Sequence, residues 1–442
     1  YLRIDRILET AKRCGAEAIH PGYGFLAENP ALARACEESG IALVGPSAAS
    51  MELMGSKTRS RQTVSAAGVA VVPGTIEPLG TAEEAAQRAA DFGYPVMVKA
   101  AAGGGGKGLR LVRAPEELPS AFRDAQSEAE NAFNDSQVYL EKYLERPRHI
   151  EIQVIGDRYG NLVYLGEREC SIQRRHQKVV EECPSPLVDE ALRRRMGEAA
   201  VCVAQVAGYH NAGTVEFLVD RDRNFYFLEM NTRLQVEHPI TEIVTGLDLV
   251  KLQLGVAAGE RLPFNQQQAL AGWRGAAIEC RIYAEDPENN FYPSPGTITA
   301  LVPPGGPGVR ADSGVYHGWT VPVEYDPLIS KMIAWGQDRG EAIVRMRRAL
   351  DEYSIVGIKT TIPFFKRLLD HPDFLAGNLD TALLDRILAT PPASSEDTAA
   401  SEIAALAAAL YTAQRNGRVP NLREQPNVSR WKLEGRRELL RR

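Results

Sequence analysis

The pattern of polar and apolar residues singles out one segment near the middle of the chain. Between residues 228 and 237, the odd positions carry carboxylates, amides and a guanidinium, and the even positions are apolar apart from one threonine. A period of two is typical of an extended strand with one polar and one apolar face. A solvated strand face usually mixes lysine, threonine, serine and glutamate. The pattern therefore favours a functional face, with a half-buried structural strand as the alternative.

The residues just before this segment predict a β-hairpin. Thr214–Val219 and Phe225–Met230 have the composition of strands, and residues 221–224 have that of a turn. With the turn centred between residues 222 and 223, Glu216 lies directly opposite Glu229. Two carboxylates that face each other across a strand pair repel, and a divalent cation held between them would reverse the sign of that interaction.

Magnesium takes carboxylate and amide oxygens together with substrate phosphates, and Asn231 lies on the same strand face as Glu229. We therefore interpret Glu216, Glu229 and Asn231 as a magnesium–nucleotide site. A fully extended chain from residue 229 to 237 would separate its ends by ~26 Å, too far for one reaction centre. We predict that the strand ends near Asn231 and that the chain then turns, which returns Arg233 and Glu237 to the metal.

Residues 1–50 predict part of an open α/β sheet. Helices are expected at Ile4–Arg13 and, capped by Asn29, from Pro30 to Ser39, and strands at Ala16–His20 and Ile41–Val44. Two strands rarely form a sheet alone, so we expect further strands of this sheet before residue 1. The run of glycines and aromatics after His20 lies where open α/β sheets bind ligands, with a simple turn as the alternative.

A glycine-rich loop follows the predicted strand Tyr94–Ala100, which carries Lys99 near its end. Residues 103–108 read Gly-Gly-Gly-Gly-Lys-Gly, and a second strand is expected at Leu109–Val112. Successive glycines bring backbone N–H groups close to an anion. The loop lacks the Ser/Thr and the following helix of a Walker A motif. A strand–loop–strand hairpin indicates instead a mobile phosphate lid, and a flexible turn is the alternative.

The later part of the chain combines strands, a basic run and helices. Gln173–Lys178 is rich in basic residues, which usually mark a solvated face, although its histidine and glutamine suit directed hydrogen bonds. Residues 276–335 predict strands, the first of which carries Arg281, and Glu341–Tyr353 predicts an amphipathic helix. A linker rich in proline, serine and alanine then leads into a helix from about Glu402 to Ala413.

Composition limits the classes of partner and compartment. The net charge of −6 gives no support for nucleic acid as a partner. The six cysteines form no close CxxC pair, which indicates reduced thiols and argues against a zinc ribbon. No apolar run reaches membrane-spanning length and no signal peptide is recognisable. We expect a cytoplasmic protein without membrane contact, or one of the mitochondrial matrix if the source is eukaryotic.

These motifs together resemble the biotin carboxylases, which are ATP-grasp enzymes found alone or within acetyl-, propionyl- and methylcrotonyl-CoA carboxylases and pyruvate carboxylase. The resemblance covers residues 1–388 and rests on motifs in the family's order: His20-Pro-Gly-Tyr-Gly-Phe-Leu, Met54-Gly-Ser-Lys57, Lys99 with the glycine loop, Glu141-Lys-Tyr-Leu144, Arg148-His-Ile-Glu-Ile-Gln153, Gln173-Arg-Arg-His-Gln-Lys178 and Glu229-Met-Asn-Thr-Arg-Leu-Gln-Val-Glu237. The tail resembles, more weakly, the region that follows this domain in long acyl-CoA carboxylase α chains.

The resemblance implies a mixed α/β and α+β fold with several domains. They are a partial Rossmann-like pre-ATP-grasp domain at residues 1–52, an ATP-grasp domain at 53–260 whose lid covers about 72–143, and a β-rich C-terminal domain at 272–388. Residues 389–442 would hold a linker and the start of a further domain. The family's first strands and its biotin-accepting Met-Lys-Met signature are absent from this sequence.

The resemblance also implies roles for individual residues. ATP would contact Lys57, Lys99, Gly105, Gly106, Glu141, Lys142, Tyr143, Leu144, His149, Gln173, His176, Glu216 and Glu229. Glu216, Glu229 and Asn231 would hold Mg²⁺ or Mn²⁺, with two ions expected. Bicarbonate would contact Lys178, Arg233, Gln235 and Val236. Glu237 would be the general base, Arg281 would stabilise the biotin enolate, and Tyr23 would border the biotin pocket.

The implied partners are a biotin carboxyl carrier domain or protein, a carboxyltransferase, and further copies of the chain in a homo-oligomer. The implied function is ATP-dependent carboxylation of carrier-bound biotin through carboxyphosphate. One alternative is another ATP-grasp ligase, which would not share the whole run from Arg233 to Glu237 together with Arg281. A second is a non-catalytic nucleotide-binding scaffold, which would lack the base or a metal ligand.

Overall fold

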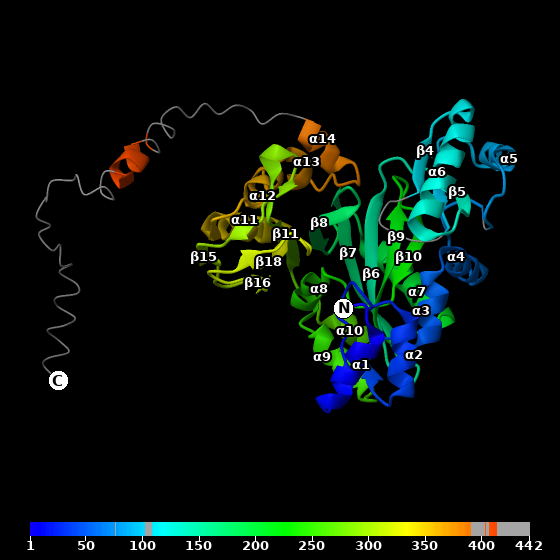
Figure 1. Cartoon of the computed structure of the whole chain (residues 1–442), viewed down its shortest axis with the longest axis horizontal. Helices are drawn as coiled ribbons and strands as arrows, with labels where there is room; N and C mark the ends of the chain where they lie inside the picture. The colour runs from blue at the N-terminus through cyan, green and yellow to red at the C-terminus, as the bar shows by residue number, and fades with distance from the viewer. Residues whose placement is uncertain (76, 102–107, 390–402, 404–405, 413–442) are drawn as a thin grey trace, which may run out of the picture. The chain divides into compact units, whose positions relative to one another are not determined.

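The computed structural model describes residues 1–75, 77–101, 108–389, 403 and 406–412 (Figure 1). The chain forms two compact units, residues 1–389 and 390–442. In the second unit, the described residues 403 and 406–412 are helical, within the helix expected from Glu402 to Ala413. Among the described residues, none of the helices has both the length and the apolar character that a membrane span requires. All further elements belong to the first unit.

The N-terminal elements follow the predicted α/β pattern. Strands β1 and β2 pair in parallel, as the open-sheet prediction requires. The Asn29 side chain caps α2 by accepting a hydrogen bond from the backbone N–H of Ala31 at 2.8 Å, which confirms the predicted cap. The elements of this region are α1 (Ile4–Arg13), β1 (Ala18–Ile19), α2 (Pro30–Glu38), β2 (Ala42–Leu43), α3 (Ala48–Gly55) and α4 (Lys57–Ala66).

A small three-stranded sheet carries the strands on either side of the glycine loop. Its order is β4-β3-β5 with all pairs antiparallel, and helices α5 and α6 pack against it. The predicted hairpin of β3 and β4 is confirmed, whereas residues 102–107 of the loop, including Gly105 and Gly106, lie outside the described residues. The elements are α5 (Ala82–Phe92), β3 (Val96–Ala100), β4 (Leu109–Val112), η1 (Pro115–Glu117), α6 (Leu118–Phe133) and β5 (Val138–Lys142).

An eight-stranded antiparallel sheet joins the middle of the sequence to its β-rich later part (Figure 1). The strand order is β10-β9-β6-β7-β8-β11-β18-β16, so β8 and β11 are direct neighbours although a long stretch of chain separates them. Residues from these two distant segments can therefore share one face of one sheet. The strands are β6 (Arg148–Gly156), β7 (Leu162–Arg174), β8 (Gln177–Cys183), β9 (Asn211–Val219), β10 (Phe225–Asn231), β11 (Ala276–Tyr283), β16 (Val309–Ser313) and β18 (Leu328–Gly336).

Helices cover this sheet, and short strands and helices complete the unit. The long helix over β6 and β7 is α7 (Glu190–Val206), and α8 (His238–Thr245) packs against β7, β8, β11 and β18. The other elements are α9 (Leu249–Ala257), α10 (Gln266–Ala271), β12 (Glu285–Asp286), η2 (Pro287–Asn289), β13 (Tyr292–Pro293), β14 (Gly296–Thr297), β15 (Ala300–Val302), β17 (Thr320–Val321), α11 (Arg339–Glu352), β19 (Ser354–Val356), α12 (Ile362–Leu369), α13 (Pro372–Leu375) and α14 (Leu383–Ala389).

Candidate active site

The β9–β10 hairpin brings the two predicted metal carboxylates face to face. Glu229 pairs with Glu216 in the strand register, which confirms the predicted juxtaposition. The predicted turn centre was wrong, because Phe225 pairs with Val219 and the turn is centred on Asp222. A bulge at Leu228 then shifts the register by one residue and restores the Glu216–Glu229 pairing.

The chain leaves the sheet at Asn231, as predicted, and its next residues are held by a carboxylate from the N-terminal region. The backbone N–H of Thr232 donates to Glu28 at 2.8 Å, and the Nε of Arg233 donates to the other oxygen of Glu28 at 3.0 Å. Arg233 also donates through Nη2 to the side-chain oxygen of Asn231 at 3.0 Å. No pattern in the sequence pointed to Glu28, which lies about two hundred residues before this turn.

Glu216 is the most extensively hydrogen-bonded carboxylate of the hairpin. It accepts from His149 Nε2 at 2.7 Å, from Lys178 Nζ at 2.9 Å, from Asn231 Nδ2 at 2.9 Å and from Gln235 Nε2 at 2.8 Å. Burial alone would raise the pKa of Glu216, but the positive charge of Lys178 and the contact with His149 outweigh it and hold the pKa well below its usual range. Glu216 is therefore a fixed anion.

Glu229 has the opposite environment. Its side chain is exposed, yet the surrounding protein desolvates the carboxylate enough to raise its pKa, and the negative charge of Glu216 raises it further. Glu229 is a repelled carboxylate opposite a fixed anion, and Asn231 lies two residues farther along the same strand. Carboxylate and amide oxygens are the hard ligands that Mg²⁺ and Mn²⁺ prefer. The residues present therefore fit a divalent cation at this end of the hairpin.

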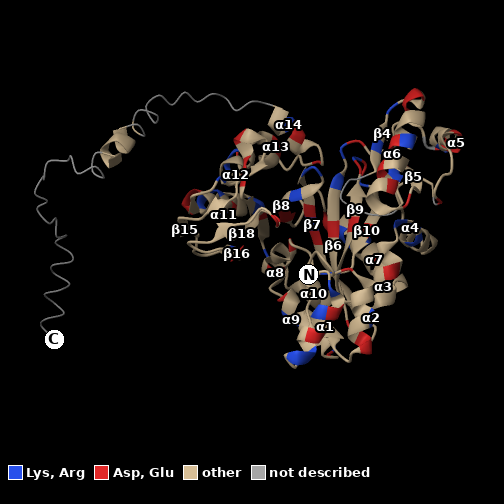
Figure 2. Cartoon of the chain, viewed as in Figure 1, with Lys and Arg blue, Asp and Glu red and all other residues tan. Residues whose placement is uncertain are grey.

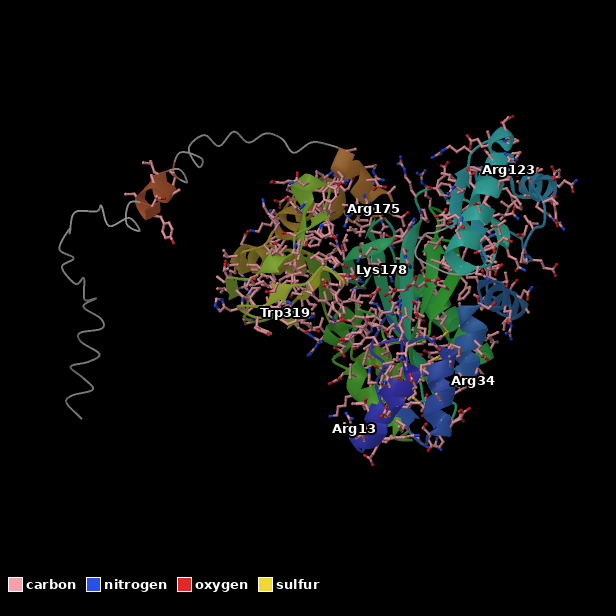
Figure 3. All side chains as sticks on the ribbon, viewed as in Figure 1. Arg13, Arg34, Arg123, Arg175, Lys178 and Trp319 are labelled. Carbon is pink, nitrogen blue, oxygen red and sulfur yellow. The ribbon has the colours of Figure 1, made fainter. Side chains whose placement is uncertain are left out.

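Lys178, which Figure 3 labels, lies at the start of β8 and is surrounded by three carboxylates. Its ammonium group contacts Glu151 and Glu216 and donates to Glu237 at 2.6 Å. Burial alone would lower the pKa of Lys178, but these three carboxylates outweigh it and raise the pKa well above its usual value. Lys178 therefore connects the metal side of the cluster with Glu237.

Glu237 lies between two cations. It accepts from Lys178 through one oxygen and from the Nη2 of Arg281 through the other, at 2.9 Å. Burial would raise the pKa of Glu237, but the charges of Lys178 and Arg281 prevail and hold it far below the usual glutamate value. Arg281, on β11, also donates through Nε to Glu181 on β8 at 2.6 Å. Residues 178, 237 and 281 are thus one hydrogen-bonded group.

His149 is held in one orientation by hydrogen bonds on both ring nitrogens. The side-chain amide nitrogen of Gln173 lies 2.6 Å from Nδ1, so Nδ1 is the acceptor and Nε2 carries the hydrogen that Glu216 accepts. His149 and Gln173, which the sequence placed with the nucleotide, are therefore brought together with the metal carboxylate. His176 is exposed in the β7–β8 turn beside Arg175, which Figure 3 labels at the tip of this hairpin.

Lys57 and Lys99, which are expected to contact the phosphates, lie on α4 and on β3 of the three-stranded sheet. Lys99 on β3 and Arg61 on α4 both form ion pairs with the buried carboxylate of Glu141. Burial lowers the pKa of Lys57, at the first position of α4, and the charge of Glu229 opposes this effect. The side chain of Lys142 turns away and donates to the backbone oxygens of Gly93 and Tyr94.

The remaining predicted residues lie on three separate segments of the chain. Tyr143 and Leu144 follow β5, and the backbone N–H of Tyr143 donates to the oxygen of Pro95 at 3.1 Å. The backbone oxygen of Val236 accepts from Lys331 on β18 at 2.9 Å. Burial is the first cause that raises the pKa of Tyr23, and the charge of Glu279 adds to it, which places Tyr23 on the Arg281 side.

Sequence reasoning missed several buried charges beneath the cluster. Arg168 on β7 is fully buried, pairs with Glu151 and donates to the side chains of Gln153, Thr241 and Thr214 at 2.8, 2.9 and 3.0 Å. Figure 2 shows positive and negative residues along β6 and β7 in the interior of the sheet. The available signal was polar residues at a period of two within a strongly apolar strand, as in Ile-Glu-Ile-Gln-Val at residues 150–154.

Three segments of the chain match known protein families. Residues 1–51 match the biotin carboxylase N-terminal domain, and residues 279–386 match the biotin carboxylase C-terminal domain. Residues 56–265 match the family described as carbamoyl-phosphate synthase L chain, ATP binding domain. The matched segments include both Lys178 and Arg281.

Individual relatives are similar over most of the chain. Biotin carboxylase of Nostoc sp. is 53% identical over 387 residues, which cover 88% of the chain and 86% of that protein. Biotin carboxylase 1 of Bacillus subtilis is 52% identical over 387 residues, which cover 87% of the chain and 85% of that protein.

A solved structure shares the fold as well. It is the biotin carboxylase domain dimer of the 2-oxoglutarate carboxylase of Hydrogenobacter thermophilus, in complex with MgADP, ADP and bicarbonate. The TM-score is 0.84 at 49% identity, and the match covers 87% of the chain and 85% of that structure.

Proposed function

The chain belongs to the biotin carboxylase family, and we propose how its residues divide the steps of that reaction. It catalyses the carboxylation of biotin by bicarbonate with hydrolysis of ATP, and it uses Mg²⁺. The observation that carries our proposal is the continuous hydrogen-bonded cluster from Glu216 through Lys178 and Glu237 to Arg281. Relatives that are themselves biotin carboxylases give no support to the alternatives of another ATP-grasp ligase or a non-catalytic scaffold.

At the nucleotide end, Lys57 and Lys99 neutralise the phosphates and the segment from Glu141 to Leu144 lines the adenine. His149 and Gln173 hold the Glu216 carboxylate in place, while Glu216, Glu229 and Asn231 hold the divalent cation. When bound, the cation offsets the phosphate charge that develops during phosphoryl transfer. This division agrees with the low pKa of Glu216, which keeps that ligand ionised.

At the centre, Lys178, Arg233, Gln235 and the backbone at Val236 bind bicarbonate, and Glu237 removes its proton. A bicarbonate oxygen then attacks the γ-phosphorus, ADP leaves and carboxyphosphate forms. A carboxylate with a very low pKa is a poor base. Bicarbonate that takes over the donor of Lys178 would release Glu237 from that ion pair. The pKa of Glu237 would then rise toward the range in which a carboxylate accepts a proton.

At the far end, Arg281 stabilises the oxyanion of biotin. Carboxyphosphate breaks down to CO₂ and phosphate, phosphate accepts the ureido proton, and the biotin enolate attacks CO₂. A guanidinium offers paired donors to the developing charge and stays protonated throughout. Tyr23, beside Glu279 and Arg281, borders the space for biotin.

The relatives include components of larger carboxylases, such as the propionyl-CoA carboxylase alpha chain of Ruegeria pomeroyi. We propose that this chain likewise acts with a biotin carrier domain or protein and with a carboxyltransferase, and that it forms a homo-oligomer in the cytoplasm. An oxygen label tests the carboxyphosphate step directly. Bicarbonate labelled with ¹⁸O should give phosphate that carries one labelled oxygen, whereas unlabelled phosphate would mean that water attacks ATP instead.

Replacing Glu229 with glutamine should weaken magnesium-dependent ATP binding by about tenfold or more, because metal affinity follows the number of charged ligands. The measurement is calorimetric titration of ATP into the protein with and without Mg²⁺. Glu198→Gln, on the exposed side of α7, is the matched control. An unchanged magnesium dependence in the Glu229 variant would show that the opposed carboxylates do not share a cation.

Replacing Glu28 with glutamine should raise the KM for bicarbonate roughly fivefold, which corresponds to the ~1 kcal/mol that a partly exposed ion pair contributes. Glu28 holds Arg233 and the Thr232 backbone through separate oxygens, so the amide keeps one contact and loses the charge. The check is the bicarbonate dependence of ADP release. An unchanged KM for bicarbonate would exclude Glu28 as the residue that orients Arg233.

A further inference from the structure

Two buried carboxylates beside Arg281 belong to none of the reaction steps proposed above. Glu181 on β8 and Glu279 on β11 are directly opposite in the strand register, and both are completely buried. Glu181 uses one oxygen to accept from Arg281, but its other oxygen has no hydrogen-bond partner among the described residues. In the same part of the chain, neither oxygen of Glu279 has a partner.

Unpaired buried carboxylates in this arrangement are unfavourable when both are charged. Directly opposed residues of an antiparallel pair bring like charges close together, and buried polar atoms without partners are rare. One proton shared between the two groups removes one charge and supplies the missing hydrogen bond. Burial, followed by the charge of Glu181, raises the pKa of Glu279 well above its usual value, and burial raises the pKa of Glu181 to about 7.

The surrounding charges are consistent with one retained proton. Charged and titratable groups reach this region from the elements packed around it. They are Lys178 on β8, Cys170 on β7, Arg281 and Tyr283 on β11, Lys331 on β18, Arg310 and Asp312 on β16, Tyr23 before α2, and Glu237, His238 and Glu242 at α8. Lys331 donates to the backbone at Val236, and Arg310 pairs with Glu242 and Asp312. Arg281 is thus the cation bonded to Glu181, and it is shared with Glu237.

We propose that Glu181 and Glu279 share a single proton and together form the support that orients Arg281 toward biotin. Glu181 is the positioning residue, because it contacts the guanidinium at both Nε and Nη2, whereas Glu237 contacts Nη2. Glu279 stays neutral, so that a third carboxylate does not cancel the positive charge that the biotin oxyanion requires. This inference rests on the proposed role of Arg281.

The test uses Glu181→Gln and Glu279→Gln in the full chain, with ADP release measured with bicarbonate, with and without saturating biotin. Glu181→Gln should lower the ratio of biotin-stimulated to biotin-independent release by about 10- to 100-fold, the range typical of groups that orient a functional side chain. Glu279→Gln mimics the protonated acid and should keep the stimulation at neutral pH. Glu182→Gln, on the other face of β8 and paired with Arg339, is the matched control.

The pH profile separates a shared proton from a merely structural role. A pair with raised pKa values holds its proton through neutral pH and loses it in alkaline solution. The wild-type chain should therefore lose biotin stimulation as the pH rises, and Glu279→Gln should lose less of it. Infrared difference spectra of wild type minus Glu279→Gln should show the carbonyl band of a protonated carboxyl group.

Each outcome has a distinct meaning. If Arg281→Gln leaves biotin stimulation intact, the proposed role of Arg281 fails and the inference fails with it. If Arg281→Gln abolishes stimulation while Glu181→Gln does not change it, only the support is wrong. If wild type and Glu279→Gln share one alkaline profile and the carboxyl band is absent, the shared proton is disproved, even where Glu181→Gln does not fold.

Discussion

Replacing Glu237 with glutamine is expected to lower bicarbonate-dependent ADP release by about 10²- to 10⁴-fold, the contribution typical of a positioned general base. Glutamine preserves the size of the side chain but cannot accept the bicarbonate proton. The Glu237 carboxylate is buried and bonded to Lys178 and Arg281, on the side of the cluster away from the hairpin that holds the metal carboxylates. ATP affinity should therefore change little.

The control for this change is Glu242→Gln, one turn farther along α8, where the carboxylate pairs with Arg310. The thermal unfolding temperatures of both variants show whether a loss of activity comes from the missing base or from a destabilised fold. The folded-state pKa of Glu237 lies below its ordinary value, so its ion pairs stabilise the fold at any pH above the ordinary pKa of a glutamate. That stabilisation disappears only as the pH falls through the lowered pKa. Turnover near that of wild type in the Glu237 variant would remove Glu237 as the base.

Replacing Arg168 with alanine should lower the free energy of unfolding by about 3–5 kcal/mol, the cost of breaking a buried ion pair from one side. The guanidinium is fully buried and holds Glu151, Gln153 and the hydroxyl groups of two threonines. Its loss leaves the Glu151 carboxylate with Lys178 as its remaining cation among the described residues. Arg168 thus supports the cluster from beneath, without contact to any substrate.

Urea denaturation measures this effect. Arg194→Ala, on the exposed side of α7, is the matched control and should change the free energy of unfolding by no more than about 0.5 kcal/mol. A loss below ~1 kcal/mol for Arg168→Ala would mean that the surrounding polar groups find other partners, and that the buried pair is not essential to the fold.

Local geometry made one part of the site predictable from the sequence. The Glu216–Glu229 pair follows from a short hairpin, and the end of β10 at Asn231 follows from the reach of an extended chain. The bulge at Leu228 was not predicted, because it depends on how the strands pack in the sheet. The predicted Glu216–Glu229 pairing is correct because the bulge compensates for the misplaced turn centre.

Contacts between distant segments were beyond the reach of these patterns. Glu28 reaches Arg233 from the N-terminal region, and Glu181 faces Glu279 only because β8 and β11 are neighbours in the sheet. The packing of distant segments determines both contacts, and periodicity carries no information about that packing. The resemblance placed Arg281 near biotin, but the carboxylates that hold it became visible only in the three-dimensional arrangement.

The roles proposed for the cluster predict that ATP cleavage is coupled first to bicarbonate and then to biotin. Glu216 and Arg281 lie at opposite ends of one chain of hydrogen bonds, with Lys178 and Glu237 between them. Biotin binding at Arg281 can therefore alter the hydrogen bonds of Glu237, the carboxylate that acts on bicarbonate. Such a chain would be unnecessary in a protein that only binds nucleotide.

The most direct measurement is ADP release from MgATP by the full chain, with bicarbonate and biotin added separately and together. We predict little release with biotin alone, measurable release with bicarbonate, and a further increase when free biotin accompanies bicarbonate. Release that is independent of bicarbonate, or ATP binding with no release under any of these conditions, would contradict the assignment of this cluster to biotin carboxylation.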